Sequence, residues 1–178
     1  MKRLLITILF VGIGIVANAQ NVDNFISALR DENRVNIRLT FANARIHGMT
    51  EAEFAKYEKD WYKDMPEIVG GFVNDLNYEI DGLLRFGNYP EAKYTLEVSV
   101  VEIATDGSID SDVNLINNSD GNVVAKYSCL RAGSVPWGTK LYLIKASVSG
   151  SGEKFGEMLY HAFKKSRSKR ATKHSNTK

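Results

Sequence analysis

Oxygen-bearing side chains gather in two expected turns in the second half of the chain, where they are candidates to bind a cation. They are Asp106, Ser108, Asp110, Asp112 and Asp120. Carboxylate and hydroxyl oxygens are the ligands that a hard cation such as Ca²⁺ takes. An EF-hand loop, however, needs a glycine after its third ligand and a closing glutamate, and the sequence has neither here. Solvated hairpin turns therefore explain these residues better than a calcium site.

Groups suited to proton transfer or nucleophilic attack are few. The histidines, His47, His161 and His174, are too scattered to indicate a zinc site, and Cys129 is expected to be a buried thiol in a strand. No Gly-x-Ser-x-Gly nucleophile motif occurs. The glycine-rich residues 150–156 match neither a dinucleotide fingerprint nor a P-loop, so they are expected to let a helix pack closely on the sheet. No catalytic residue, metal or other cofactor is expected.

Two features favour binding over catalysis. Trp137 lies in an expected Ser-Val-Pro-Trp-Gly loop, where an exposed indole suits a binding patch. Basic residues without any acid follow Phe163, and they are Lys164, Lys165, Arg167, Lys169, Arg170, Lys173 and Lys178. Because this segment lacks apolar periodicity, it is expected to be disordered. It is either a solvated terminus or a contact for anionic lipid, lipopolysaccharide or an acidic partner. The candidate binding patch comprises Trp137, Lys164, Lys165, Arg167, Lys169 and Arg170.

The first 19 residues of the 178 have the pattern of a secretory signal peptide. Lys2 and Arg3 precede the apolar residues 4–16, and a small-x-small sequence ends at Ala19, after which we expect cleavage. The apolar run is shorter than the roughly 20 residues that span a bilayer. A lipoprotein signal would have a cysteine after the cut, whereas this chain has Gln20, so no lipid anchor is expected.

Charge is distributed unevenly along the expected mature chain. Without Lys2 and Arg3, 21 basic residues remain against 21 acidic ones. Residues 20–163 hold 14 bases and 21 acids, a net charge of −7, and the remaining seven bases follow them. The overall isoelectric point near 8.6 therefore does not indicate a nucleic-acid-binding domain.

The first half of the chain alternates between helical and strand patterns. We expect a short helix at residues 22–33 and a strand at 35–41, where apolar and polar residues alternate. Thr50 and Glu53 form a capping box, which predicts a helix that includes Trp61 and ends before Pro66. A second helix is expected from Pro66 to about residue 84.

The second half begins with strands and ends with a helix. Strands are expected at residues 94–103, with a bulge near the end, and at 112–116 and 122–130, with a hairpin turn between the last two. Residues 140–148 are expected to be a further strand, and a helix is expected from Gly152. The sequence thus predicts a single α+β domain with a mainly antiparallel sheet of four to five strands packed against two to three helices. Its bounds are residues 20–165, followed by a basic disordered tail at 166–178.

Three segments carry a resemblance to a known group: the strand Tyr94-Thr95-Leu96-Glu97-Val98, the turn and strand from Asp120 to Ala125, and the helix entry Phe155-Gly156-Glu157-Met158-Leu159. In this order they resemble small exported envelope proteins of Gram-negative bacteria. The fold of that group is similar to the curli secretion-channel subunit and the N-terminal domain of the Tol translocation protein. The resemblance spans roughly residues 35–165. It implies an α+β fold and a role in assembly or binding, with no functional residue to carry over.

The sequence therefore favours an exported, non-enzymatic accessory or binding protein of the bacterial envelope, either periplasmic or associated with the outer membrane. The expected partner is another envelope protein or an anionic surface, not a nucleic acid, and the mature chain has no expected membrane span. A small exported hydrolase or ligand carrier with an unrecognised site is the alternative. The oligomeric state stays open at this point.

Overall fold

Strand β5 (Tyr94–Ile103) lies at the centre of a seven-stranded sheet. The structure is a computed structural model that describes residues 22–133 and 137–175, with side chains up to residue 168. The alternating sequence of β5 gives the expected alternation of burial: Leu96 and Val98 are buried, and Glu97 between them is partly exposed. The expected signal peptide and its cleavage site lie outside the described residues.

One edge of β5 continues into the antiparallel strands that the sequence predicts. β6 (Ile109–Asn117) pairs with β5, and β7 (Val123–Ala132) pairs with β6. The register of β5 and β6 shifts between Val100 and Glu102, which confirms the expected bulge. The extra residue turns Val101 outward and returns Ile103 to the buried face, so both ends of β5 contribute to the core.

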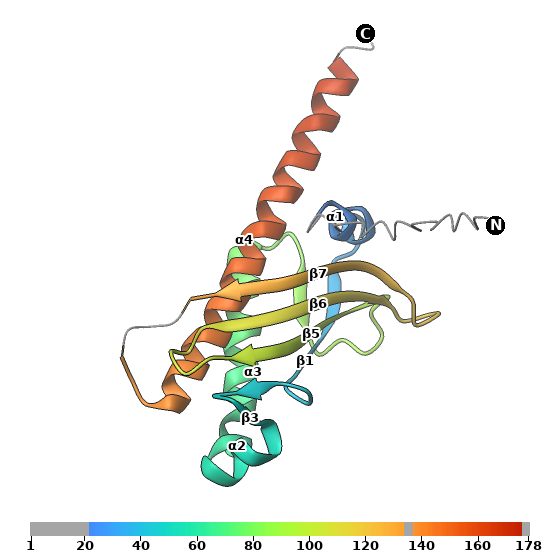
Figure 1. Ribbon diagram of the computed structural model, residues 1–178. Coiled ribbons are helices and arrows are strands. Elements are labelled where there is room, and N and C mark those ends of the chain that lie inside the picture. Colours follow the sequence, from blue (N-terminus) through green and yellow to red (C-terminus); the bar gives the residue numbers. More distant parts are fainter. Residues whose placement is uncertain (1–21, 134–136, 176–178) are drawn as a thin grey trace, which may run out of the picture.

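The other edge of β5 is parallel, which makes the sheet mixed and larger than expected (Figure 1). β1 (Arg34–Thr40) and β2 (Arg45–Ile46) pair with β5 one after the other, β4 (Arg85–Gly87) pairs with β1, and β3 (Met49–Thr50) pairs with β2. β2, β3 and β4 are not predicted from the sequence, because strands of two or three residues are too short to show an alternating pattern.

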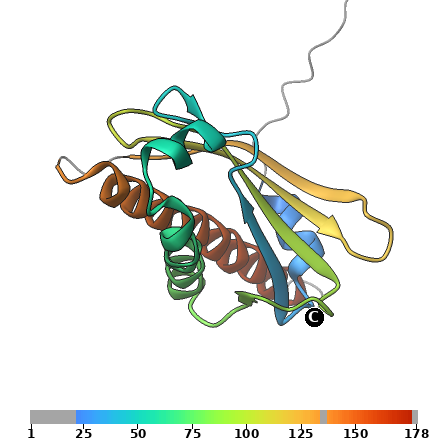
Figure 2. The ribbon, with the colours of Figure 1, turned by 90° about the horizontal axis from the view of Figure 1, so that it is seen from below.

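The described part of the chain has four helices, and the predicted α+β class is confirmed. α1 (Asp23–Leu29), α3 (Trp61–Glu79) and α4 (Lys140–Ser175) lie on one side of the sheet, and α2 (Glu51–Tyr57) lies at its lower end in Figure 1. Figure 2 shows α3 and α4 side by side, covering this face. The buried residues of the sheet and the helices form one core between the two layers.

The expected capping box at the start of α2 is present: the Thr50 hydroxyl accepts the backbone N–H of Glu53, and the Glu53 carboxylate accepts the backbone N–H of Thr50. The helix, however, ends at Tyr57, and Trp61, which was expected inside the same helix, begins α3. Trp61 is fully buried, with ring centroids 5.1 Å from Phe41 and 5.2 Å from Phe54. Pro66 lies inside α3 and does not begin a helix.

The expected strand at residues 140–148 is wrong, because this segment is the start of α4. Its buried side chains follow a helical spacing, from Ile144 through Val148 to Phe155. Gly152, expected to be the entry to the helix, lies inside it and faces the backbone of Phe72 on α3. The glycines therefore allow close packing on a neighbouring helix, and not on the sheet as expected.

Candidate functional site

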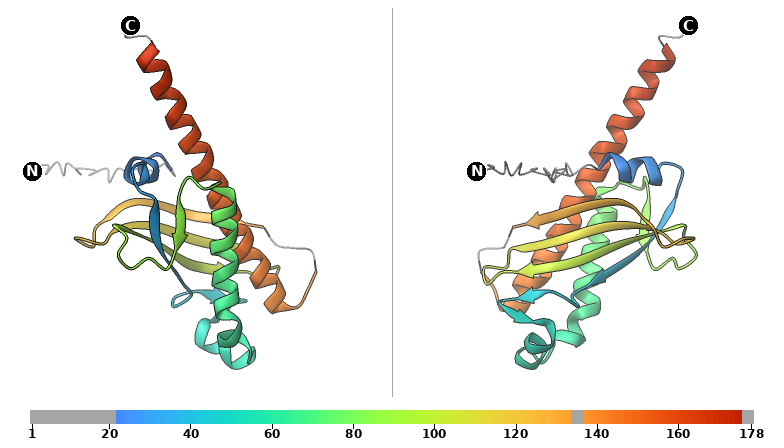
Figure 3. Two further views of the ribbon diagram at one scale, coloured as in Figure 1. Left: turned by 180° about the vertical axis from the view of Figure 1, so that it is seen from behind. Right: turned by 45° about the vertical axis from the view of Figure 1, so that its right-hand side comes forward.

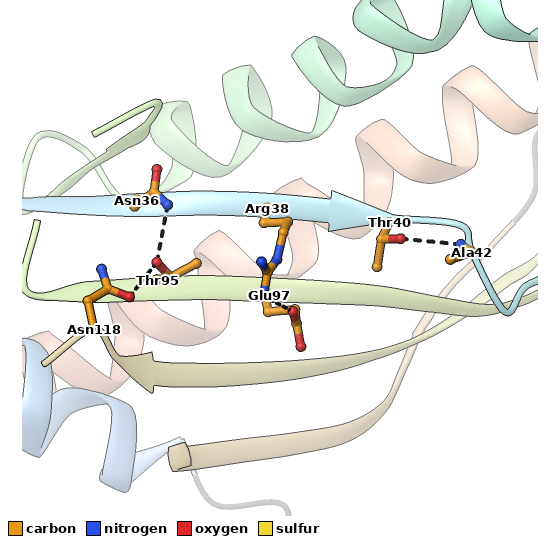
Figure 4. Close-up of polar contacts among 7 residues, drawn as sticks. All are labelled: Asn36, Arg38, Thr40, Ala42, Thr95, Glu97 and Asn118. Carbon is orange, nitrogen blue, oxygen red and sulfur yellow. Dashed lines mark hydrogen bonds and ion pairs between the residues drawn. The ribbon is translucent and has the colours of Figure 1, made fainter. Parts of the chain in front are cut away.

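Polar side chains of β1 and β5 lie on the sheet face opposite the helices, and several of them contact one another (Figure 4). Arg38 on β1 forms an ion pair with Glu97, its register partner on β5. The side-chain amide of Asn36 donates to the Thr95 hydroxyl at 3.1 Å, and this hydroxyl donates to Asn118 at 2.8 Å. These contacts join β1, β5 and the β6–β7 turn, and they bring together no group with an obvious chemical reactivity.

The carboxylates that were candidates for a cation site do not converge. Asp106 accepts hydrogen bonds from the backbone and the hydroxyl of Ser108 in the β5–β6 turn, whereas Asp120 accepts from Asn122 in the β6–β7 turn, at the opposite end of β6. The Asp106–Ser108 hydrogen bonds lower the pKa of Asp106. Among the described residues, no group of three or more His, Cys, Asp or Glu side chains is placed to hold a metal ion.

The two carboxylates on β6 itself, Asp110 and Asp112, form ion pairs with bases on β7. Asp110 accepts from Arg131 Nε at 2.8 Å, and Asp112 lies 3.8 Å from Lys126 Nζ. Asp112 also accepts the backbone N–H of Cys129 at 3.1 Å. These are cross-strand contacts that support the register of the sheet.

Cys129 is exposed, so the expected buried thiol is wrong. The register of β6 and β7 shifts between Ser111 and Val113, which places an extra residue on β7. The next buried residue after this shift is Leu130, and Cys129 has a positive φ of 56°. A bulge cannot be read from the alternating pattern of β7, and it reverses the face on which every later residue lies.

His47 forms, with Gly48, the two-residue turn between β2 and β3, and both residues have positive φ. Its ring packs edge-on against Phe54 at a centroid distance of 5.6 Å. Both ring nitrogens are buried and have no hydrogen-bond partner among the described residues. Burial, and to a smaller extent the charge of Lys140, hold the pKa of His47 below its usual value. The ring is thus a neutral packing group in the folded protein.

His47 predicts a loss of stability in mild acid. Because its pKa is lower in the folded than in the unfolded chain, the unfolded chain binds more protons as pH falls below about 6.5. The denaturation midpoint should therefore decrease from pH 7.5 towards pH 5. His47→Asn should flatten this dependence, since asparagine tolerates the left-handed turn and does not titrate. His161→Gln, on the exposed surface of α4, is the control and should keep it; equal slopes for wild type and His47→Asn would contradict the prediction.

The candidate binding patch is divided between the two ends of α4. Trp137 is 78% exposed just before the helix, whereas Lys164, Lys165 and Arg167 are exposed more than twenty residues later. At 1.5 Å per residue, about 36 Å of helix separates Lys140 from Lys164. Lys169 and Arg170 lie in the same helix, beyond the last described side chain. Trp137 and the bases therefore do not form one surface.

Two contacts near these ends were not found from the sequence. Lys140 donates to the Tyr57 hydroxyl at 3.0 Å and lies 4.2 Å from its ring centroid, which attaches the start of α4 to α2. At the other end, Lys164 lies 4.9 Å from the ring centroid of Tyr160. Tyr160 and Lys164 are four residues apart, and this spacing could have indicated their contact on a helix. The contact of Lys140 with Tyr57 joins residues 83 positions apart, so the sequence gives no such indication of it.

Comparisons with known proteins give only remote likenesses. No protein-family model matches the chain, and no curated protein matches its sequence. The PelC dodecamer from Paraburkholderia phytofirmans is similar over 68% of this chain and 86% of that one, with 13% identity and a TM-score of 0.39. Protein XCC0632 from Xanthomonas campestris, of family DUF330, is similar over 76% and 88%, with 10% identity and a TM-score of 0.41. Likenesses this weak carry no argument about function, and the resemblance to the curli and Tol proteins stays a prediction.

Proposed function

We propose that this chain is an exported, non-enzymatic accessory protein of the bacterial envelope that binds an anionic surface through the cationic end of α4. The observation that carries the proposal is that this end continues as a helix past the folded body. Figures 1 and 3 show it leading away from the sheet. We call residues 164–175 the cationic extension, and they contain six bases and no acid.

The cationic extension has no means of burying itself on its own body. Phe163 is the last buried side chain of the described part of α4, and Lys164, Lys165 and Arg167 after it are exposed. At 100° per residue, its basic positions are spread around the helix and leave no apolar stripe to pack. The sequence predicted no regular structure here, whereas the structure continues the helix to Ser175. A cationic rod of this kind suits a phosphate-bearing surface.

Other features support binding in preference to a hydrolase. His47 lies in the β2–β3 turn, Asp110 on β6 and Cys129 on β7, and the hollow next to Asp110 is lined by neither His47 nor Cys129. The hollow next to Asp110, of about 420 Å³, is open, and the polar atoms of Arg131 and Lys154 that line it already form hydrogen bonds within the protein.

No helix in the described part of the chain is long and apolar enough to cross a bilayer. Export rests on the basic, apolar and small-residue pattern that ends at Ala19.

Vesicle sedimentation tests the proposal directly. Full-length mature protein should sediment with phosphatidylglycerol vesicles at low salt and not with phosphatidylcholine vesicles. Each base near an anionic membrane contributes about 1 kcal/mol, so truncation after Ser166, which removes five bases, should weaken binding at least tenfold. Raising the salt should weaken binding of the full chain in the same direction. Lipopolysaccharide in a parallel series distinguishes a lipid phosphate from a glycolipid phosphate.

A matched pair of variants separates a docking site from a general charge effect. K164Q/K165Q/R167Q removes three bases of the cationic extension, whereas K56Q/K59Q/K63Q removes three exposed bases at the opposite end of the molecule. Only the first triple variant should lose vesicle binding. Equal sedimentation of the full-length and truncated proteins at low salt would refute the proposal and leave the extension as a solubilising terminus.

A further inference from the structure

A hollow of about 260 Å³ lies between α1 and α4, at the point where the cationic extension begins. Arg30, which directly follows α1, lines it from one side, and Lys165 and Ser166 of α4 line it from the other. Figure 3 shows α1 beside α4 where this helix leaves the sheet. We call this the basic hollow, after its two bases.

Core packing holds the two sides of the basic hollow together. Phe25 of α1 is fully buried, and its ring centroid lies 5.5 Å from that of Phe155 on α4. Leu29, about one turn later in α1, is also fully buried. Arg30 comes directly after Leu29, so the same packing keeps it beside α4. The position of Arg30 therefore depends on the folded body and not on the cationic extension.

The two bases of the basic hollow are exposed and form no ion pair. Neither the Arg30 nor the Lys165 side chain makes a hydrogen bond or a salt bridge with any residue that the structure describes. The two bases in the hollow next to Asp110, by contrast, already form hydrogen bonds. Asp23 is the one acid among the described lining residues, so the lining carries a net charge of +1. Two like charges beside one small hollow repel each other, and an anion bound between them relieves this repulsion.

We propose that the basic hollow binds one phosphate group, which either the headgroup of an anionic lipid or free phosphate supplies. A guanidinium donates two parallel hydrogen bonds to phosphate oxygens, an ammonium adds a point charge, and a hydroxyl adds a further donor. Sites for drug-sized ligands measure roughly 300–1,000 Å³, so a hollow of about 260 Å³ suits a small charged group.

The inference deepens the proposed function and rests on it for the lipid source. Lys165 and Ser166 belong both to the basic hollow and to the start of the cationic extension. A phosphate-bearing surface that contacts the start of the extension therefore also reaches the hollow. Arg30 on the folded body then adds a contact that the extension alone does not supply.

Nuclear magnetic resonance titration of the mature, ¹⁵N-labelled protein tests the site. Glycerophosphoglycerol, the soluble headgroup of phosphatidylglycerol, and inorganic phosphate are the probes, and acetate is the carboxylate control. The amide signals of residues 26–30 and 162–166 should shift with a phosphate probe and shift less with acetate.

Variants of Arg30 show whether its guanidinium makes the contact. R30Q should raise the dissociation constant of the phosphate probe at least about tenfold, because hydrogen bonds to a charged group are lost. R30K keeps the charge without the planar fork, so it should bind with intermediate affinity. R45Q removes an exposed arginine on β2 and should leave the affinity unchanged.

Phosphatidylglycerol vesicles distinguish the two sources of the phosphate group. A lipid source requires that R30Q also weakens sedimentation with these vesicles, whereas free phosphate as the ligand requires that R30Q weakens only the titration with inorganic phosphate. Either result supports the basic hollow as a phosphate site. K169Q/R170Q/K173Q should weaken vesicle binding and leave the titration unchanged, so failure of the hollow and failure of the proposed surface binding are separate results. Absence of shifts at residues 26–30, equal shifts with acetate, or an equal loss of affinity in R30Q and R45Q would each overturn the proposal.

Discussion

Replacing Phe155 by alanine is expected to lower the free energy of unfolding by about 3–5 kcal/mol, the range for a fully buried phenylalanine. Its side chain is 0% exposed and contacts two other elements edge-on. The ring centroid lies 5.5 Å from that of Phe25 on α1 and 6.2 Å from that of Tyr127 on β7. The substitution therefore removes the group that joins α1, α4 and the edge of the sheet, and it leaves a cavity in a closed part of the core.

Urea denaturation followed by circular dichroism measures this effect. Tyr142→Ala is the control, because Tyr142 lies on the same helix and is 53% exposed, so its removal should change stability far less. A denaturation midpoint for Phe155→Ala equal to that of the wild type would show that α4 is not part of the core.

The sequence predicts best those elements whose pattern is long and whose neighbours are close in the chain. The alternation of β5 is visible over ten residues, and even its bulge is visible, because Val101 and Ile103 depart from the pattern. The capping box of Thr50 and Glu53 is confirmed for the same reason, since both partners lie within one helical turn. Local chemistry decides each of these features, so the sequence contains the evidence for them.

The start of α4 shows how a local pattern gives a wrong answer. Residues 140–148 alternate as a strand does, and the glycines at 150 and 152 suggest a break. Packing against α3 decides otherwise: Lys145 forms ion pairs with Asp64 and Glu67, and Ile144 and Val148 are buried. These contacts join positions far apart in the sequence, and tertiary packing of this kind outweighs local preference.

The hollow where α3 ends beside α4, which Glu79 and Glu157 line, could not be predicted for a similar reason. Glu79 and Glu157 are 78 positions apart in the sequence, and nothing near either residue indicates that α3 and α4 lie side by side. Asp110 and Asp120, by contrast, are close in sequence and were grouped as a candidate cation site, yet β6 holds them at opposite ends. Proximity along the chain is a poor guide to proximity in a sheet, because each residue of a strand adds about 3.3 Å.

Gly152 on α4 lies directly against the backbone of Phe72 on α3, and Gly152→Ala is expected to destabilise the protein by about 2 kcal/mol or more. A methyl group at this position would overlap the carbonyl oxygen of Phe72 and would lie 3.0 Å from its Cα and carbonyl carbon. These are backbone atoms, so they cannot rotate away, and the two helices must separate. That cost exceeds the gain of about 1 kcal/mol that alanine brings to a helix interior.

Gly150→Ala provides the matched control for Gly152→Ala, two residues earlier in the same helix. A methyl group at Gly150 would meet nothing within 4 Å, so only the helix-forming gain remains, and the protein should become more stable by about 0.5–1 kcal/mol. The two substitutions add the same single methyl group and should shift the urea midpoint in opposite directions. Stabilisation by both would mean that α4 does not rest on the backbone of α3 at Phe72, and that the close contact between these helices does not hold the core together.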